Sequence, residues 1–191
     1  MARTQAADYD AKREAITDHA ARLFARRGFA AASISDLADR CKVSKSLIYH
    51  YYASKEDILF DVMIEHIDEL LDAVQSVHDE ESPARNAFKA LTKELLRHYV
   101  GAADKQKVLL YELDSLPRAK KAEIVEKQRK IISIVEGVLK NAAATKLNRA
   151  ALRARTMLYF GMLNWSHTWF DPKGAVSRDE LADMASDLAL G

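Results

Sequence analysis

The seven residues from Ser44 to His50 carry hydroxyl, ammonium, phenol and imidazole groups, all of which form hydrogen bonds. Such groups can bind phosphate oxygens and the edges of bases. If a helix begins at Lys45, Ile48 and Tyr52 lie four residues apart on one of its faces and can be buried. The pattern therefore predicts a short amphipathic helix whose polar side is available to a DNA duplex. The residues expected on that side are Lys45, Ser46, Tyr49 and His50.

Two further helices are expected before this segment, and they would position it. An apolar stripe at helical spacing predicts the first, from about Asp10 to Arg27, and Gly28 follows where a helix can end. The second helix follows Ser33, which has an aspartate three residues later and so resembles a capping box. Residues Cys41–Val43 predict a turn before the third helix. Three helices with a tight turn between the last two have the geometry of a helix-turn-helix, which places its last helix in the major groove.

The distribution of charge agrees with a local phosphate-binding surface. The whole chain has a formal net charge of only +1. Between Lys12 and Lys55, however, nine Lys and Arg residues stand against four Asp and Glu residues. A basic first quarter in a nearly neutral chain suits a partner that is a polyanion. A chance fluctuation in a charge-rich chain would give the same excess.

The rest of the chain also reads as helical. It holds only six Gly and three Pro, and apolar residues recur three and four apart nearly everywhere. The fold class expected is all-α, with nine helices in two domains: residues 1–55 for the helix-turn-helix and residues 56–191 for a larger helical body. The later helices are expected at about 55–77, 83–100, 104–115, 117–144, 148–170 and from Ser177 onward.

The stretch from Val43 to Glu56 resembles the tetracycline-repressor (TetR) family of transcriptional regulators. The family pattern there is roughly Val-Ser-x-Gly-x-Leu-Tyr-x-Tyr/His-Phe-x-x-Lys-Glu. Ser46 departs from the usual Gly and adds a hydroxyl close to DNA, and Cys41 stands where Ala or Gly is usual. The residues that match in kind are Val43, Ser44, Ile48, Tyr49, Tyr51, Tyr52, Lys55 and Glu56. The resemblance implies a repressor that leaves its operator when a small molecule binds its C-terminal domain.

The resemblance also implies roles for individual residues of the first domain. Those expected to anchor phosphates are Ser33, Lys45, Tyr49 and Lys55. Those expected near bases or backbone are Ser44, Ser46, Leu47, His50 and Tyr51. Ordinary core packing is the alternative for Tyr49 and, more strongly, for Tyr51.

The last two helices are expected to pair two copies of the chain. Both have broad apolar faces, and a helix-turn-helix reads only one half-site, so a homodimer is expected. The alternative is that these faces pack inside one chain. The residues that form them are Leu152, Met157, Leu158, Phe160, Leu163, Leu181, Met184 and Leu188.

Two short stretches, Leu110–Pro117 and Gly161–Gly174, are similar to family members that respond to CoA thioesters. Arg129, with Lys130 and Arg155, could meet the phosphates of such a ligand. Plain core or surface roles are the alternative for every ligand candidate, and another hydrophobic small molecule is the alternative effector. The full set of ligand-binding candidates is Tyr99, Leu109, Arg129, Ile132, Phe160, Asn164, Trp165 and Trp169.

Other classes of protein find little support. The longest apolar run, Met157–Leu163, is too short to cross a membrane, no signal peptide is visible, and there is one cysteine, so a cytoplasmic protein is expected. No metal-ligand spacing, nucleophile–base set or phosphate loop points to an enzyme, a metal or a cofactor. The alternatives are an all-α enzyme or carrier, and a helical adaptor that has lost DNA binding.

Overall fold

The computed structural model describes residues 2–77 and 83–191, and their side chains from residue 9 onward. Among these residues all regular secondary structure is helical, which confirms the expected fold class. The α-helices are α1 (Ala2–Arg27), α2 (Ile34–Cys41), α3 (Lys45–Tyr51), α4 (Lys55–Ser76), α5 (Ala84–Gly101), α6 (Ala103–Tyr111), α7 (Arg118–Ala142), α8 (Arg149–Trp165) and α9 (Arg178–Leu190). Two 3-10 turns, η1 (Leu113–Ser115) and η2 (Ser166–Thr168), follow α6 and α8.

Three helix boundaries differ from the sequence expectation. Helix α1 begins at Ala2 rather than near Asp10, because its first turns are rich in Ala, Arg and Gln, which favour helix without an apolar stripe. The helix expected at 104–115 ends at Tyr111 and continues as η1. The helix expected at 148–170 ends at Trp165.

The early end of α8 has a local cause. The side chains of three consecutive residues after Trp165 bond to backbone carbonyls three positions earlier. Ser166 Oγ lies 2.7 Å from Leu163 O, His167 Nδ1 lies 2.6 Å from Asn164 O, and Thr168 Oγ1 lies 2.8 Å from Trp165 O. These side chains satisfy the last carbonyls of the helix and favour the tighter 3-10 turn η2.

The described residues form two compact units. The first comprises Met1–His66 and Asp104–Ile124, and the second comprises Ile67–Ala103 and Val125–Gly191. This differs from a single division after residue 55, because α4 and α7 contribute residues to both units and α6 belongs to the first from Asp104 onward.

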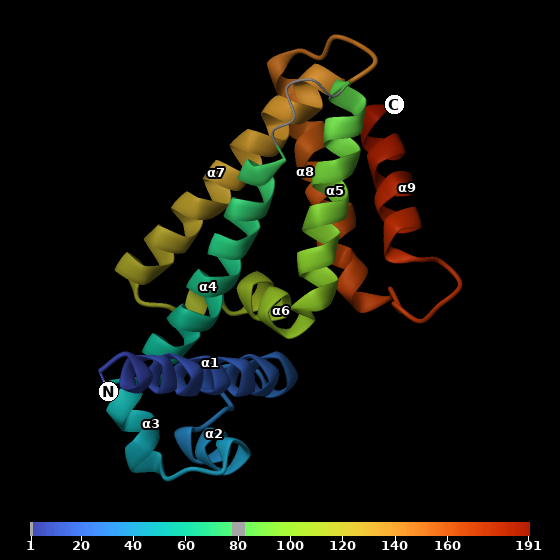
Figure 1. The fold of residues 1–191 in the computed structure, drawn as a ribbon. Coiled ribbons are helices and arrows are strands. Elements are labelled where there is room, and N and C mark those ends of the chain that lie inside the picture. The colour runs from blue at the N-terminus through green and yellow to red at the C-terminus, as the bar shows by residue number, and fades with distance from the viewer. Residues whose placement is uncertain (1, 78–82) are drawn as a thin grey trace. The chain divides into compact units, whose positions relative to one another are not determined.

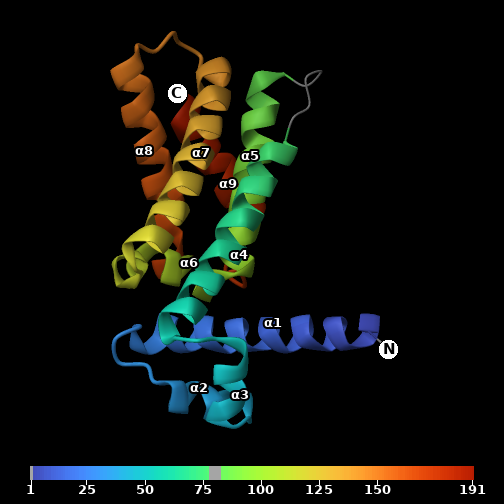
Figure 2. The same cartoon turned by 90° about the vertical axis from the view of Figure 1, so that its left-hand side faces the viewer.

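In the first unit, α2 and α3 lie on the same side of α1 (Figures 1 and 2). Phe24, Leu37, Ile48 and Ile58 are fully or almost fully buried among these helices and α4. Buried side chains of α4 and α6 also interact, since His66 Nε2 lies 2.7 Å from Gln106 Oε1. Burial of large apolar side chains stabilises the unit and fixes the orientation of α3.

In the second unit, α5 packs along α9, and α8 also contacts α9 (Figure 1). Phe88, Leu91, Leu95 and Tyr159 form part of its core. Helices α7 and α8 run side by side in opposite directions and are joined by a loop (Figure 2). Among the helices that the structure describes, none is long and apolar enough to span a membrane.

The α5–α9 contact is lined by ion pairs on its exposed edge. Arg85 and Lys89 lie 2.8 and 3.0 Å from Asp187, and Lys93 lies 3.4 Å from Asp183. Hydrogen bonds from Lys89 and then Arg85 lower the pKa of Asp187. Because these side chains are exposed, the pairs set the register of the two helices more than they stabilise the fold.

Candidate functional site

Helix α2 begins with a capping box, as its sequence predicts. Ser33 N–H donates to Asp36 Oδ2 at 3.1 Å, and Asp36 N–H donates to Ser33 Oγ at 3.1 Å. The Ser33 hydroxyl also donates to Asp36 Oδ2 at 2.6 Å, and this bond lowers the pKa of Asp36. The hydroxyl proton of Ser33 is therefore engaged inside the protein, although the sequence assigned this residue to a phosphate.

The turn between α2 and α3 depends on a left-handed residue. Lys42 has φ of 56°, the one positive value at a non-glycine residue within the described chain. Val43 N–H then donates to Ala38 O at 3.0 Å, so the chain reverses within three residues. Cys41 is half-buried in this turn, and its burial raises the pKa of the thiol, which favours the unreactive protonated form.

Helix α3 has the two faces that its sequence predicts. Ser44 caps its first turn by accepting a hydrogen bond from Leu47 N–H at 3.2 Å. Ile48 and Tyr52 are buried, with 0% and 4% of their surface exposed. The side chains exposed on the other face are Lys45, Ser46, Tyr49 and His50. The exposed fraction of Tyr49 is 56%, so ordinary core packing does not account for its position.

Tyr51 and Leu47 lie at the edges of the exposed face of α3, and both are half-buried. The Tyr51 ring is held between aromatic neighbours, with its centroid 4.7 Å from that of Tyr9 and 5.3 Å from that of His50. These contacts fix the end of α3 against α1. They restrict Tyr51 and leave Tyr49 the more accessible of the two phenols.

A buried polar cluster anchors the residue that ends α3. Tyr52 O–H donates to Asp61 Oδ2 at 2.8 Å, and Arg13 Nε donates to the same oxygen at 2.8 Å. Arg13 Nη2 also pairs with Asp61, whose residue surface is 7% exposed. Burial raises the pKa of Tyr52, so its phenol remains neutral and donates. This cluster joins α1, α3 and α4 and so fixes the orientation of the polar face.

Lys55 makes internal contacts at the start of α4. Its Nζ donates to Phe29 O and Ala32 O, both at 2.8 Å, and lies 4.2 Å from the centre of the Phe29 ring. The sequence assigned this ammonium to a phosphate. In the structure it ties α4 to the loop between α1 and α2, and its contact with a phosphate stays a prediction.

Several residues that position this unit were not among the candidates that the sequence indicated. Glu112 Oε1 accepts a hydrogen bond from Phe29 N–H at 3.1 Å. The neighbouring Gly28 has a φ of +80°, which favours glycine. Asp57 accepts from Ser54 and pairs with Lys120 of α7. Glu112 and Lys120 lie more than sixty residues from their partners, so no local spacing could have indicated these two contacts.

The structure does not bring all the expected ligand residues together. Leu109 is buried in the first unit, whereas the other seven belong to the second. Tyr99 and Phe160 are buried there, and Ile132 and Asn164 are half-buried. Arg129 is exposed on α7. Arg155, another residue considered for phosphates, donates to Ala189 O and Leu190 O at the end of α9.

Trp165 and Trp169 are exposed, with 62% and 57% of their surface accessible. They line an apolar hollow on the outer side of α8 and α9, together with side chains of both helices. Trp165 also lines a second hollow with Met157, Leu158 and Gly161. These positions coincide with the faces expected to pair two copies, rather than with a buried ligand site.

No group of three or more His, Cys, Asp or Glu side chains that could hold a metal ion occurs among the described residues. The chemistry available in the first unit is hydrogen bonding and charge. The exposed face of α3 has the hydrogen-bonding groups and the positive charge that can bind phosphates and base edges.

Comparison with known families covers both parts of the chain. Residues 16–62 match the family model described as "Bacterial regulatory proteins, tetR family". Residues 81–191 match the model described as "Tetracyclin repressor-like, C-terminal domain".

Two curated proteins illustrate the range of similarity. The chain is 28% identical over 91 residues to the uncharacterized regulator YuxN of Bacillus subtilis, and it covers 31% of that protein's length. It is 23% identical over 188 residues to the transcriptional repressor KstR2 of Mycolicibacterium smegmatis, and this match covers 94% of the chain and 89% of that protein.

Two solved structures have similar folds. A TetR-family transcriptional regulator from Bordetella parapertussis is 37% identical, with a TM-score of 0.86 and 93% of each chain covered. The structure of AibR in complex with isovaleryl coenzyme A and operator DNA is 24% identical, with a TM-score of 0.78, and it covers 94% of this chain and 98% of that one.

Proposed function

Because the chain belongs to the tetR family of bacterial regulatory proteins, whose members are DNA-binding transcriptional regulators rather than enzymes, we propose that it is a homodimeric repressor that a CoA thioester releases from its operator. The proposal of DNA recognition is based on the exposed face of α3. Four polar side chains are exposed there above two buried ones, on a helix that follows a tight turn.

Within the first unit we propose unequal roles for the nine DNA candidates. Lys45, Ser46, Tyr49 and His50 are exposed and can reach a groove. Ser44 is exposed at the N-terminus of α3, while Leu47 and Tyr51 would contact DNA from the edges of the same face. Lys55 and Ser33 would contact phosphates only by exchanging bonds they already make within the protein.

DNA binding can be tested with the duplex that lies upstream of the protein's own coding sequence. Fluorescence anisotropy at several salt concentrations would give both the affinity and the number of phosphates neutralised. Specific binding should exceed binding to a scrambled duplex by at least about a thousandfold. Equal affinity for the two duplexes would exclude an operator in that region.

We propose that two copies pair through α8 and α9. Seven of the eleven exposed large hydrophobic side chains lie on these helices or just after η2: Met157, Leu158, Met162, Trp165, Trp169, Met184 and Leu188. Gly161 of α8 lines the same surface, and a side chain added there would meet nothing within 4 Å. An apolar patch with a glycine at its centre suits the close approach of a second helix.

The effector class is proposed from two kinds of support. The chain has similarity along most of its length to AibR, whose structure holds isovaleryl coenzyme A, and its Leu110–Pro117 and Gly161–Gly174 stretches are similar to CoA-responsive regulators. Tyr99 and Phe160 are buried apolar surfaces for an acyl chain in the second unit. Another hydrophobic small molecule remains the alternative effector.

We propose that the effector acts through α4, which has residues in both units. A ligand can lower operator affinity only if it binds the non-operator conformation more tightly. Thermal shifts against a panel of CoA thioesters should identify the preferred ligand, because binding to the folded state raises stability. That ligand, added to the anisotropy assay, should then weaken operator binding. Unchanged affinity with every stabilising thioester would refute this effector class.

A further inference from the structure

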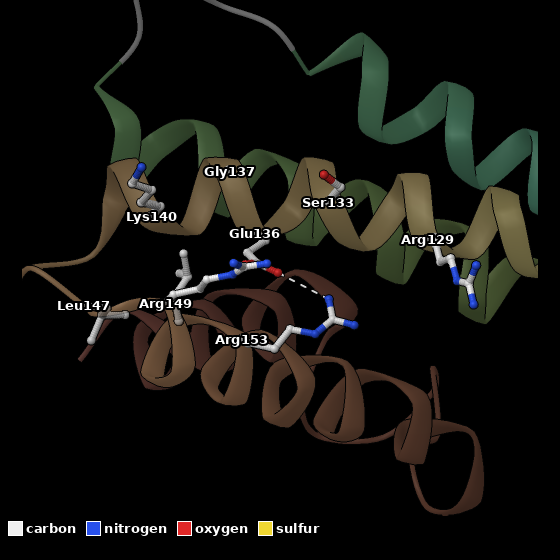
Figure 3. Close-up of a pocket in the computed structure, with 9 residues that line it drawn as sticks. Arg129, Ser133, Glu136, Gly137, Lys140, Leu147, Arg149 and Arg153 are labelled. Atoms are coloured by element: carbon white, nitrogen blue, oxygen red, sulfur yellow. Dashed lines mark hydrogen bonds and ion pairs between the residues drawn. The ribbon is translucent and has the colours of Figure 1, made fainter.

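A basic groove lies between α7 and α8 in the second unit (Figure 3). Its volume is about 580 Å³, which is enough for part of a nucleotide-sized ligand. Arg129, Ser133, Gly137 and Lys140 follow one another at three- and four-residue spacing, so they share one face of α7. Arg149 and Arg153 line the groove from α8.

The groove holds four cationic side chains and one carboxylate. Arg153 Nη1 lies 3.3 Å from Glu136 Oε2, and this pair joins the two helices across the groove. Within the described chain no ion pair involves Arg129, Lys140 or Arg149. In Figure 3, Arg149 and Arg153 extend from α8 toward α7, Arg129 extends from α7 toward α8, and Lys140 points away. The groove therefore has an excess of positive charge that its own residues do not balance.

This arrangement differs from the other basic side chains of the second unit. Lys89 and Arg85 pair with Asp187, Lys93 pairs with Asp183, and Lys127 pairs with Asp68. These four cations are thus matched by an acid on a neighbouring helix. A group of unmatched cations on one concave surface suits a bound anion.

Gly137 provides a second observation that is independent of charge. It lies inside α7, where glycine favours helix less than alanine does. A side chain added at Gly137 would meet nothing within 4 Å, so packing within this chain does not require the glycine. Its absent side chain leaves the backbone of α7 open to the groove, next to the Ser133 hydroxyl one turn earlier. A glycine in such a place is suited to the close approach of a ligand.

We infer that this groove binds the phosphorylated end of a small molecule that carries two or more phosphates, which for a CoA thioester is the phosphorylated ADP portion. The choice of ligand rests on the proposed function. Arg129 and Lys140, at the two ends of the α7 side of the groove, lie eleven residues apart, or about 16 Å along the helix, which is longer than a single phosphate needs. Arg149 and Arg153 can each bind a phosphate with two hydrogen bonds, and Glu136 positions the Arg153 guanidinium.

The inference can be tested with the full-length protein by isothermal titration calorimetry. Two pairs of probes separate phosphate recognition from the rest of the ligand: coenzyme A against pantetheine, and ADP against adenosine. Coenzyme A and ADP should bind, and the phosphate-free partner of each pair should bind at least about tenfold more weakly. Rising salt should weaken the two phosphorylated probes and leave the others unchanged.

Charge reversal at Arg149 and Arg153 should weaken coenzyme A and ADP by about tenfold or more for each substitution. Lys173→Glu is the matched control, because Lys173 is an exposed cation of the second unit that does not line the groove. Gly137→Leu provides a second test, since it fills the groove in open space and improves helix propensity. This variant should be folded, as stable as the wild type or more so, and impaired in coenzyme A binding.

The outcomes separate this inference from the proposed function. Equal binding of coenzyme A and pantetheine would refute phosphate binding in the groove. Unchanged coenzyme A binding in Arg149→Glu and Gly137→Leu would refute it as well. If an acyl-CoA still releases operator DNA normally from an Arg149→Glu/Arg153→Glu variant, the proposed function is supported and the groove is not the phosphate-binding site. If coenzyme A binding depends on Arg153 but no thioester affects DNA binding, the groove is a phosphate-binding site and the proposed effector role is wrong.

Discussion

The outer face of α3 and the outer face of α8 and α9 are both exposed stripes at helical spacing, but their compositions are opposite. Lys45, Ser46, Tyr49 and His50 on α3 are polar and remain well solvated when nothing is bound. Leu158, Trp165 and Leu188 on α8 and α9 have most of their surface in contact with water. Water stabilises the first face and penalises the second. We therefore expect the polar face to bind its partner reversibly and the apolar face to be covered permanently.

The largest effect should come from placing a charge on the apolar face. Leu158→Arg would put a guanidinium charge where a second copy is expected to pack. The dimer dissociation constant should rise on the order of 100-fold, about 3 kcal/mol, because a buried charge lacks a partner. Sedimentation equilibrium measures this constant directly. Val176→Arg is the control, since Val176 is an exposed apolar residue of the loop before α9 and lines neither hollow. An unchanged constant in Leu158→Arg would mean that the copies pair elsewhere or not at all.

A substitution beneath the polar face should have the next largest effect. Asp61→Ala removes the acceptor shared by Tyr52 and Arg13. Unfolding free energy should fall by about 2 kcal/mol, less than for a wholly buried pair because Arg13 is partly exposed. Urea denaturation measures the change, and Asp61→Asn should lose less because it retains an acceptor oxygen. Equal losses in the two variants would show that the carboxylate's hydrogen bonds are not the cause.

Two lysines of the first unit allow a residue that contacts DNA to be distinguished from one that stabilises the fold. Lys45→Ala should weaken binding to all DNA sequences by about tenfold and lower the salt slope by about one. Lys55→Ala should instead lower the unfolding free energy by about 1–2 kcal/mol, because Phe29 O and Ala32 O lose their donor. Its salt slope should stay close to that of the wild type. A drop in slope for Lys55→Ala without a loss of stability would restore Lys55 as a phosphate anchor.

The smallest effect should be a change in acid sensitivity. The hydrogen bond from Lys120, followed by that from Ser54, lowers the pKa of Asp57 in the folded protein. The ionised carboxylate therefore contributes stability above the unfolded pKa of about 4, and this contribution is lost as the pH falls through the lower folded value. Asp57→Asn should cost at most about 1 kcal/mol at pH 7 because the site is partly exposed. The difference between variant and wild type should shrink below about pH 4, as followed by thermal unfolding across pH. A difference that is constant with pH would exclude the charge as its source.

The sequence predicted the parts of the molecule that depend on local spacing. The burial of Ile48 and Tyr52 and the capping box at Ser33 follow from residues within four positions of one another. Such signals survive folding because the helix itself brings these residues together.

Contacts between distant residues could not be predicted in this way. Lys55 carries the charge of a phosphate anchor, but its bonds to Phe29 O and Ala32 O depend on how α4 meets a loop that lies more than twenty residues earlier. Trp165 and Trp169 are four apart, and that spacing fits a ligand wall and a subunit interface equally well. Their exposure in the folded chain favours the interface, and their contact with a ligand stays a prediction.

The discontinuous composition of the first unit limits how this repressor can be recombined with its relatives. Phe29 N–H donates to Glu112, and Asp57 pairs with Lys120, so the helix-turn-helix depends on the segment 104–124. A chimera joined near residue 55 would combine the helix-turn-helix of one protein with the body of another. Phe29 and Asp57 would then lack their native partners from segment 104–124. Exchange of operator specificity between homologues should therefore succeed more often when the transferred piece includes both the helix-turn-helix and segment 104–124. Amino-acid changes in one of these two segments should constrain changes in the other.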